Sequence, residues 1–380
     1  MSATYSVDWQ NAYGEALGNF TNFMSLNYTR TFNNKGALTM TIPNVITANS
    51  INRDDRLIVK RKVGNMLPYN DTDTFWLVRQ VLFNADTREW TIKADDPLSI
   101  ISRRLVAYPA LTEYSDKTLE SWDINKVVRA LPVADDMIKE FVYENLGAGC
   151  LDADRDISDY FTIDTDKSLG AVVEKAAAYQ NLLSTIQDVA NQSAQSGTPI
   201  YFDMILRPDN TLLFTTFANL RGTNRGQSSG NPLLFNGSVN IENLNLTWDY
   251  SKELNYAYMA GDGGTADTQL LVEVEDTDRS SLSPWNRNEL FQDLGNETTN
   301  EGFMQAEGEE LLYGSRPKLI VTGNPIDSPG YEYGINYFYG DIVEVNVQGF
   351  ALDCTIDSVA VNVANGIEKV TTRLLGEITL

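Results

Sequence analysis

The sequence IVEVNVQGFALDCTIDSVAVNVANGIEKVTTRLL, residues 342–375, decides the fold of this 380-residue chain. Apolar residues take every second position, as in half-buried β-strands, in three runs: Val343, Val345 and Val347; Leu352, Cys354 and Ile356; and Val359, Val361 and Val363. The change from even to odd positions predicts a β-bulge near residues 357–358. Asn365-Gly366 predicts a tight hairpin turn, and a third strand follows with Val370, Thr372 and Leu374 inward. The stretch is therefore an antiparallel meander whose further partner strands must come from earlier in the chain.

Charge and the lack of histidine restrict what the chain can do. It carries 29 basic and 52 acidic side chains, a net charge of -23. Tight nucleic-acid binding needs a basic face, so we expect neither nucleic-acid binding nor stable binding to an anionic membrane. The sequence has no histidine, which excludes Ser-His-Asp and Cys-His catalysis and the HExxH zinc helix. Any enzyme activity would depend on carboxylates, Lys, Tyr or a hard metal ion.

Cysteine usage and hydropathy indicate the compartment. Cys150 and Cys354 lie in segments that we expect to be at least partly buried, and we interpret them as reduced thiols, with one disulfide as the alternative. The N-terminus lacks the basic and apolar regions of a secretory signal. No stretch approaches the roughly 18–20 apolar residues of a membrane span. We expect a chain that is made and folded in a cytoplasm.

The predicted fold class is β-rich α+β, in four parts along the chain. Residues 1–108 form a small barrel-like domain of short strands, at residues 20–28, 37–42, 56–62, 75–84 and 90–94. A short helix up to residue 104 ends this part, with Asp96 as its N-cap and Pro97 as its first residue.

Residues 109–198 form an α-rich insertion, with helices at residues 123–131, 134–146 and within 168–196. Residues 199–260 and 316–380 form a second barrel-like β domain, which includes a hairpin around the turn at residues 207–210. In that domain Trp248 alternates with leucines, so we expect it to lie in the core. Residues 261–315 form a smaller mixed insertion, with a glycine turn at 261–264, a strand at 270–274 and a helix near 303–313.

Two patterns could carry a binding site, and each has a plainer structural interpretation. An acidic cluster has the spacing of cation ligands, Asp152, Asp154, Asp156 and Asp159. Ile157 and Ile163 hold the positions where a calcium loop needs Gly and Glu, so we expect a solvated loop, with a weak cation site as the alternative. Arg221-Gly222 and Arg225-Gly226 could contact nucleic acid, but on a chain this acidic we expect a surface loop.

Three further patterns could carry chemistry. The glycine run at residues 261–264 follows a strand but lacks the GK[ST] ending of a phosphate loop, so we expect a turn. Glu307, Glu309 and Glu310 could supply a glycosidase carboxylate, but a charged helix face is the plainer interpretation. The six Trp and 18 Tyr could line a sugar-binding surface. We assign no catalytic, cofactor-binding or metal-binding residue, and we expect no enzyme activity.

Four stretches carry a resemblance to a known family: Tyr28-Thr29-Arg30 with Gly36 and residues 38–43; residues 92–98 with Ser102-Arg103-Arg104; residues 221–226 with 231–235; and Tyr339-Gly340-Asp341-Ile342-Val343 before the meander and Gly376. In this order they resemble the central tail-hub proteins of tailed bacteriophages, the family that includes the hub of contractile-tailed phages. Phe338-Tyr339 departs from the smaller aliphatic residue expected before Gly-Asp. The chain stops at Leu380 without a long extension, so the resemblance does not imply cell-wall hydrolysis.

The resemblance implies two barrel-like domains that form a tube wall, and a homotrimer with a pseudo-sixfold ring. Such a ring adapts the sixfold tail tube or distal tail protein to threefold tip proteins. Its implied partners are those proteins, the tape measure protein and tail-tip fibre or receptor-binding proteins, at the tail tip of the virion. We expect DNA only in transit, past lumen loops that are acidic or neutral, because a basic wall would hold phosphates. The alternatives are a carboxylate-dependent cell-wall glycan hydrolase and a carbohydrate-binding receptor module.

Overall fold

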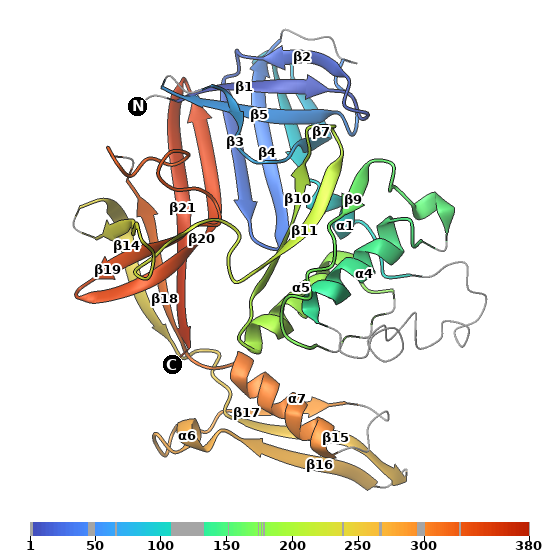
Figure 1. Ribbon diagram of the computed structural model, residues 1–380, viewed down its shortest axis with the longest axis vertical. Helices are drawn as coiled ribbons and strands as arrows, with labels where there is room; N and C mark the ends of the chain where they lie inside the picture. The colour runs from blue at the N-terminus through green and yellow to red at the C-terminus, as the bar shows by residue number, and fades with distance from the viewer. Residues whose placement is uncertain are drawn as a thin grey trace. The chain divides into compact units, whose positions relative to one another are not determined.

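The computed structural model describes residues 3–44, 50–64, 67–107, 133–150, 152–173, 175, 177, 179–237, 239–265, 268–294, 301–326 and 328–379. The chain forms two compact units (Figure 1). Unit 1 comprises Met1–Glu242 and Gly323–Leu374, and unit 2 comprises Asn243–Thr322 and Leu375–Leu380. None of the helices in the described ranges has the length and apolar character needed to cross a membrane.

One extended, mainly antiparallel sheet makes up most of unit 1. Its strands follow the order β21-β20-β3-β4-β8-β7-β5-β1-β2, with β19 on β20, β6 on β5, and β12 and β13 on β19. Their bounds are β1 Ala3–Gln10, β2 Ala16–Phe20, β3 Ser25–Thr31, β4 Asn34–Pro43, β5 Arg56–Val63, β6 Tyr69–Asn70, β7 Trp76–Asn84, β8 Glu89–Asp95, β12 Asn224–Arg225, β13 Leu234–Asn236, β19 Ile342–Val347, β20 Phe350–Ala364 and β21 Ile367–Thr379. Because β3 lies between β4 and β20, strands from the two ends of the sequence share one wall.

The sheet curls so far that its distant strands meet through side chains. Tyr5 on β1 donates to Glu368 on β21 (Oη–Oε2 3.0 Å), and Arg61 on β5 donates to the same carboxylate (Nη2–Oε1 2.6 Å). Within the described residues no strand pairing joins the β2 end of the sheet to its β21 end. The expectation of a mainly β chain with large antiparallel sheets is confirmed, whereas backbone closure into a barrel is not seen.

A helical layer with its own small sheet completes unit 1. The sheet comprises β9 Phe161–Ile163, β10 Ile200–Leu206 and β11 Leu212–Ala218, and the helices are α1 Leu98–Ser102, α4 Ala134–Leu146, α5 Leu182–Gln195 and the short 3-10 helix η2 Ala153–Arg155. Helices α4 and α5 lie side by side, next to β10 and β11 (Figure 1). Their buried faces, which include Phe141 and Ile186, pack with Phe202 and Phe214 into one apolar core. The predicted helix at residues 134–146 and the hairpin around residues 207–210 are confirmed.

Unit 2 is a helix packed on a three-stranded sheet. Its elements are β14 Ile241–Asp249, β15 Tyr256–Thr265, β16 Thr268–Glu275, α6 Thr277–Ser280, β17 Glu289–Asp293, α7 Glu301–Gly314 and β18 Lys318–Pro325. The sheet order is β16-β15-β17, and Met304 and Leu312 of α7 pack on Met259 and Val274. Gly308 permits this close packing, since a Cβ there would lie 2.6 Å from Val274 Cγ2. β18 pairs with the end of β21, with Leu319 opposite Ile378.

The closing meander has the predicted strands. β20 pairs with β19 up to Thr355 and with β3 from Ser358 onward. The change of buried face, where the sequence predicts a bulge, therefore coincides with a change of partner strand. Thr372 and Leu374 are buried, as the alternation of the third strand predicts.

Several local predictions are wrong. Residues 20–28 are two strands, because β2 turns back on β1 and the Met24 amide then donates to Thr41 O (2.8 Å). The helix predicted within residues 168–196 is, by contrast, confirmed as α5, which begins at Leu182, where the Asn181 side chain accepts the Ser184 amide (3.2 Å). Residues 261–264 form no turn, since β15 continues through them to Thr265. The short helix begins with Pro97, not Asp96, as its N-cap. The predicted helix at residues 123–131 lies outside the described residues.

Two predictions about burial have different outcomes. Trp248 is 47% exposed, so its predicted place in the core is wrong. The neighbouring Leu244 and Leu246 on β14 are also only half-buried. The alternation therefore marks one face of a strand, but the described residues do not fully cover that face. Both cysteines are free thiols, Cys354 buried and Cys150 partly exposed. Burial raises the pKa of the Cys354 thiol to about 12.

Candidate functional site

The Gly340-Asp341 pair, part of the motif before the meander, holds a distant loop against β19. Asp341 is 1% exposed, and its carboxylate accepts the Thr223 amide (Oδ1, 2.7 Å) and the Arg225 guanidinium (Oδ2, 3.1 Å). Two backbone hydrogen bonds complete the contact. The Gly222 amide donates to Gly340 O (3.0 Å), and the Ile342 amide donates to Thr223 O (3.1 Å). The buried Asp341 carboxylate is thus satisfied by donors that lie 118 and 116 residues away in sequence.

Glycine at position 222 is required by this contact. A Cβ there would lie 2.3 Å from Asp341 Oδ1 and 2.7 Å from Gly340 C. Gly340 itself has φ +94, a conformation that favours glycine. The two sequence motifs that contain Arg221–Gly226 and Gly340–Asp341 are therefore one interlocking structure. We call residues 221–226 with 340–342 the Gly-Asp interlock.

Next to the interlock lies a buried ion network, the Arg30 network, formed by Arg30, Asp203, Arg221 and Tyr339. Arg221 donates to Asp203 Oδ2 from Nη2 (2.8 Å) and Nε (3.0 Å), and Arg30 donates to the same oxygen. All three charged side chains are at most 8% exposed. Burial opposes the charge on Asp203, but the two guanidinium groups outweigh it and hold the pKa of that carboxyl below its ordinary value.

The arginines of the supposed surface loop are therefore structural. Arg221 is buried against Asp203, and Arg225 is paired with Asp341. Residues 222–224 are exposed, as expected of a surface loop, but Arg221 and Arg225 are held by Asp203 on β10 and by Asp341 just before β19, which are far away in sequence.

Asp96 and Gly36, which belong to the first two resembling motifs, also meet. Asp96 is 3% exposed, and its Oδ2 accepts the Gly36 amide at 2.6 Å. A Cβ at position 36 would lie 2.5 Å from Thr29 O and 2.9 Å from Asp96 Oδ2. Burial raises the pKa of Asp96 to about 7, although the Gly36 amide and Arg30 act in the opposite direction.

A second buried arginine, Arg61, joins the curled ends of the sheet. Besides Glu368 it donates to Tyr5 Oη (2.8 Å), Tyr69 Oη (2.9 Å) and Tyr333 O (2.8 Å). The guanidinium is 2% exposed, and this set of acceptors satisfies it through all three nitrogens. Such a fully bonded buried charge fixes the geometry of the elements that it joins.

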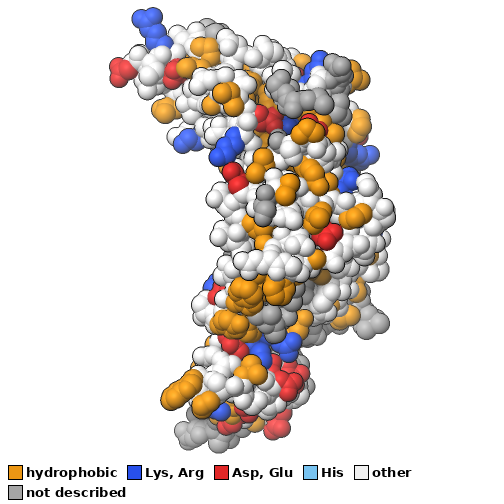
Figure 2. All heavy atoms as spheres, turned by 90° about the vertical axis from the view of Figure 1, so that its left-hand side faces the viewer, with side chains coloured by type: hydrophobic (Ala, Val, Ile, Leu, Met, Phe, Trp, Pro, Cys, Tyr) orange, Lys and Arg blue, Asp and Glu red, His pale blue; other side chains and the backbone are white. Residues whose placement is uncertain are grey.

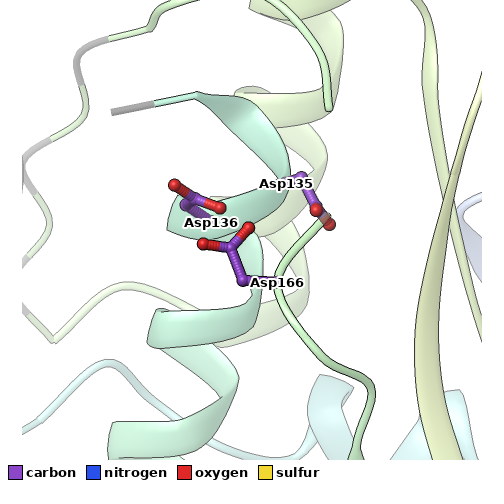
Figure 3. Close-up of side chains that lie close together, drawn as sticks. All are labelled: Asp135, Asp136 and Asp166. Atoms are coloured by element: carbon purple, nitrogen blue, oxygen red, sulfur yellow. The ribbon is translucent and has the colours of Figure 1, made fainter. Parts of the chain in front are cut away.

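A carboxylate cluster lies at the start of α4, where Asp135, Asp136 and Asp166 approach within 4.8 Å. Figure 3 shows Asp136 and Asp166 turned toward each other and the Asp135 carboxylate to one side. Asp135 is already paired with Lys139 Nζ (2.8 Å) and accepts the Lys167 amide (2.9 Å). The acids also lie near the N-terminus of α4, where a negative charge is stabilised by the helix dipole. We therefore interpret the three carboxylates as groups that anchor the loop around Lys167 to the start of α4.

The acidic loop singled out from the sequence is organised by its own backbone. Asp152 accepts the Asp154 amide (3.0 Å), and Asp156 accepts the Ser158 amide (2.8 Å). Arg155 turns inward and donates to Leu105 O (2.6 Å). In the part of the chain that the structure describes, these acids do not converge as a group of potential metal ligands.

Unit 2 carries the glutamates and two of the tryptophans. Glu309 is exposed on α7 and accepts Gln305 Nε2 (2.8 Å). A groove of about 600 Å³ is lined by exposed side chains that include Trp248, Tyr250, Leu282 and Trp285. In Figure 2, which faces the side where Figure 1 draws α6, hydrophobic side chains protrude from the lower part of the view.

Sequence reasoning missed the Arg30 and Arg61 networks and the acids of α4. Only the α4 acids left a local signal, the two consecutive Asp residues in the first turn of a predicted helix. The networks join residues up to 363 positions apart, as Tyr5 and Glu368 are, and no local pattern marks such partners.

Comparisons with known proteins give a family and a fold. Residues 9–374 match the family described as Siphovirus ReqiPepy6 Gp37-like protein. A search of curated proteins finds no match. The fold is similar to the 43 kDa tail protein of prophage MuSo2 from Shewanella oneidensis, with a TM-score of 0.56 and 11% identity over 97% of this chain and 98% of that chain. It is similar to a tail protein from Neisseria meningitidis MC58, with a TM-score of 0.54 and 11% identity over 98% and 96% of the two chains.

Proposed function

Because the chain belongs to the Siphovirus ReqiPepy6 Gp37-like family of phage tail proteins, we propose that it is the central hub of a phage tail tip or baseplate. Three copies would form a ring that adapts a sixfold tail tube or distal tail protein to threefold tip proteins. The hub would also contact the tape measure protein and tail-tip fibre or receptor-binding proteins. Its role would be structural, with no bond made or broken.

The observation that supports this proposal best is the curled sheet of unit 1. It joins strands from both ends of the sequence in one wall, since β20 pairs with β3. Buried arginines brace the wall at two places, the Arg30 network and Arg61. A tail component must keep its shape when it is assembled with neighbouring proteins. Buried, fully bonded ion pairs fix the register and orientation of the strands that they join.

Passage of DNA is the second part of the proposal. A chain of net charge -23 repels a polyanion, whereas a wall rich in lysine and arginine would bind phosphates by counterion release. We propose that the loops that face the channel are acidic or neutral, so that DNA passes without binding.

Electron-microscope class averages of the purified chain test the ring. The proposal predicts particles with threefold symmetry around an open passage. Averages that show only isolated single copies at concentrations typical of assembly would argue against it. A high-resolution map with a basic channel lining would overturn the DNA-passage part alone.

A competing hydrolase function has a direct test. The purified chain is incubated with peptidoglycan, alongside Glu307→Gln and Glu310→Gln variants. We expect no release of glycan fragments by any of the three proteins. Turnover that both substitutions abolish would replace the structural proposal with a carboxylate-dependent enzyme.

The groove with Trp248 and Trp285 favours one further function, carbohydrate binding, because exposed aromatic rings stack on sugar faces. Wild-type protein and a Trp285→Ala variant would be applied to a glycan array. Trp285 is 90% exposed, so the substitution is expected to leave folding unchanged. Glycan binding that this substitution removes would establish a receptor module, and the absence of binding would end that candidate.

A further inference from the structure

A cavity of about 550 Å³ lies in unit 1 between the β1–β2 turn, α1, β9 and the β10–β11 hairpin. Apolar side chains form most of its wall, including Phe75, Leu77, Phe161, Met204 and Leu212, all at most 7% exposed. Tyr13 and Tyr160 also line it; they are 71% and 46% exposed, with ring centroids 6.2 Å apart. The cavity is thus an apolar pocket with aromatic side chains at its solvent-exposed part. Its volume falls in the range of about 300–1,000 Å³ found for ligand sites.

Positive charge is in excess around this pocket. Arg56, Arg103 and Arg104 line it, and Asp54 is the one carboxylate among the lining residues. That carboxylate is shared: it pairs with Arg79, lies 3.5 Å from Arg53 Nε and is 4.0 Å from Arg103 Nη1. The pocket is therefore cationic on a chain of net charge -23. Its one carboxylate does not balance its three arginines.

Arg56 is the strongest sign that an anion belongs here. It is 5% exposed, lies over the Phe75 ring (4.6 Å) and donates from Nη1 to Asn210 O (3.0 Å). Its buried Nε has no hydrogen-bond partner, and no carboxylate of the described residues lies within ion-pair distance of it. A buried guanidinium without an anion is costly. Burial lowers the pKa of Arg56, and burial and then Arg79 lower that of Arg103, which agrees with a missing negative charge.

We propose that this pocket binds a carboxylate next to a large apolar side chain, carried by an acidic peptide segment of another protein. The carboxylate would pair with Arg103 and Arg104 and reduce the uncompensated charge of Arg56, while the apolar side chain would fill the space beside Phe75, Leu77 and Met204. Arginine forks match carboxylates with two parallel hydrogen bonds. The inference does not depend on a trimeric ring.

A peptide is favoured over nucleic acid by the lining. Nucleic-acid sites combine several accessible cations along a groove, whereas here most lining side chains are apolar, and five of these apolar side chains are buried. The net charge of the whole chain also repels a polyanion but allows one local carboxylate.

The test uses two fluorescein-labelled octapeptides that alternate Glu with Leu and Phe, or Gln with Leu and Phe. Fluorescence anisotropy with the full chain measures each affinity. The glutamate peptide is expected to bind about tenfold more tightly than the glutamine peptide. Arg103→Gln should weaken only the glutamate peptide, by about five- to tenfold. Arg103 is a suitable choice because its side chain is 41% exposed, so the variant should fold.

Arg88→Gln is the matched control, since Arg88 is exposed in the β7–β8 turn and does not line the pocket. Equal affinity for the two peptides, binding of neither peptide, or equal effects of the two substitutions would overturn the inference. Displacement of the glutamate peptide by a single-stranded oligonucleotide would overturn it too, in favour of a phosphate site.

Discussion

The ring of Tyr339 contacts two guanidinium groups, with Arg30 and Arg221 at 4.8 and 4.7 Å from its centroid. Burial raises the pKa of its phenol above the ordinary value, so the ring stays neutral. A small aliphatic residue before Gly340 would offer the cations no π face. The surroundings thus explain why Tyr339 departs from the resembling motif. Its aromatic ring contacts two arginines that share one aspartate.

Removal of that aspartate should be strongly destabilising. Asp203→Asn leaves two buried guanidinium groups without their anion, and we expect a loss of about 3–5 kcal/mol in unfolding free energy. Urea unfolding measures it. Asp209→Asn is the control, because Asp209 is exposed in the β10–β11 turn and accepts the Thr211 amide (3.1 Å), which an Asn side chain also accepts. Similar stability of the two variants would contradict a structural role for the Arg30 network.

Asp96 should make stability depend on pH. Its folded pKa of about 7 lies above the ordinary 3.8, so the folded state holds a proton that the unfolded state has released between these values. The wild-type chain therefore loses stability from this group as pH rises from about 4 to 7. Asp96→Asn removes the titration and keeps an acceptor for Gly36, so it should gain stability relative to wild type between pH 5 and pH 8.

Thermal unfolding at the two pH values measures this gain. Asp95→Asn, the neighbouring substitution, controls for the loss of one negative charge. If Asp96→Asn and wild type show the same change between the two pH values, the buried carboxyl does not titrate as described.

At the level of elements, the Gly-Asp interlock ties a loop to β19. Gly222→Ala places a Cβ 2.3 Å from Asp341 Oδ1, so the loop must move, and we expect a cost of about 1–3 kcal/mol. Gly230→Ala is the matched control, because a Cβ there meets nothing within 4 Å. Proteolysis under native conditions and urea unfolding would compare them. A Gly222→Ala variant as stable and as protected as Gly230→Ala would refute the interlock.

The elements also show which features the sequence can predict. The strands of the closing meander and helix α4 follow from periodicity, since each side chain's face depends on its own segment. The ion pairs of Arg221 and Arg225 could not be predicted, because their partners Asp203 and Asp341 lie in distant parts of the chain. The predicted burial of Trp248 is wrong for a different reason. Its alternation correctly indicates a strand, but periodicity does not show whether another layer covers that face.

At the level of the whole molecule, fold and family could be anticipated from four short motifs. Two of their contacts explain why the motifs occur together: Gly36 with Asp96, and Gly222 with Asp341. The division into four domains at residues 108, 198, 260 and 315 stays a prediction. The arginine-lined pocket could not be foreseen, since its walls come from six separate parts of the chain.

The central claim is that this protein acts as a ring of three copies and not through chemistry at a single site. Light scattering on the purified chain, coupled to size-exclusion chromatography, measures the mass of the particle most directly. The account predicts three times the 42.4 kDa of one chain, stable on dilution as expected for an extensive interface. A mass equal to one chain at every concentration would contradict it.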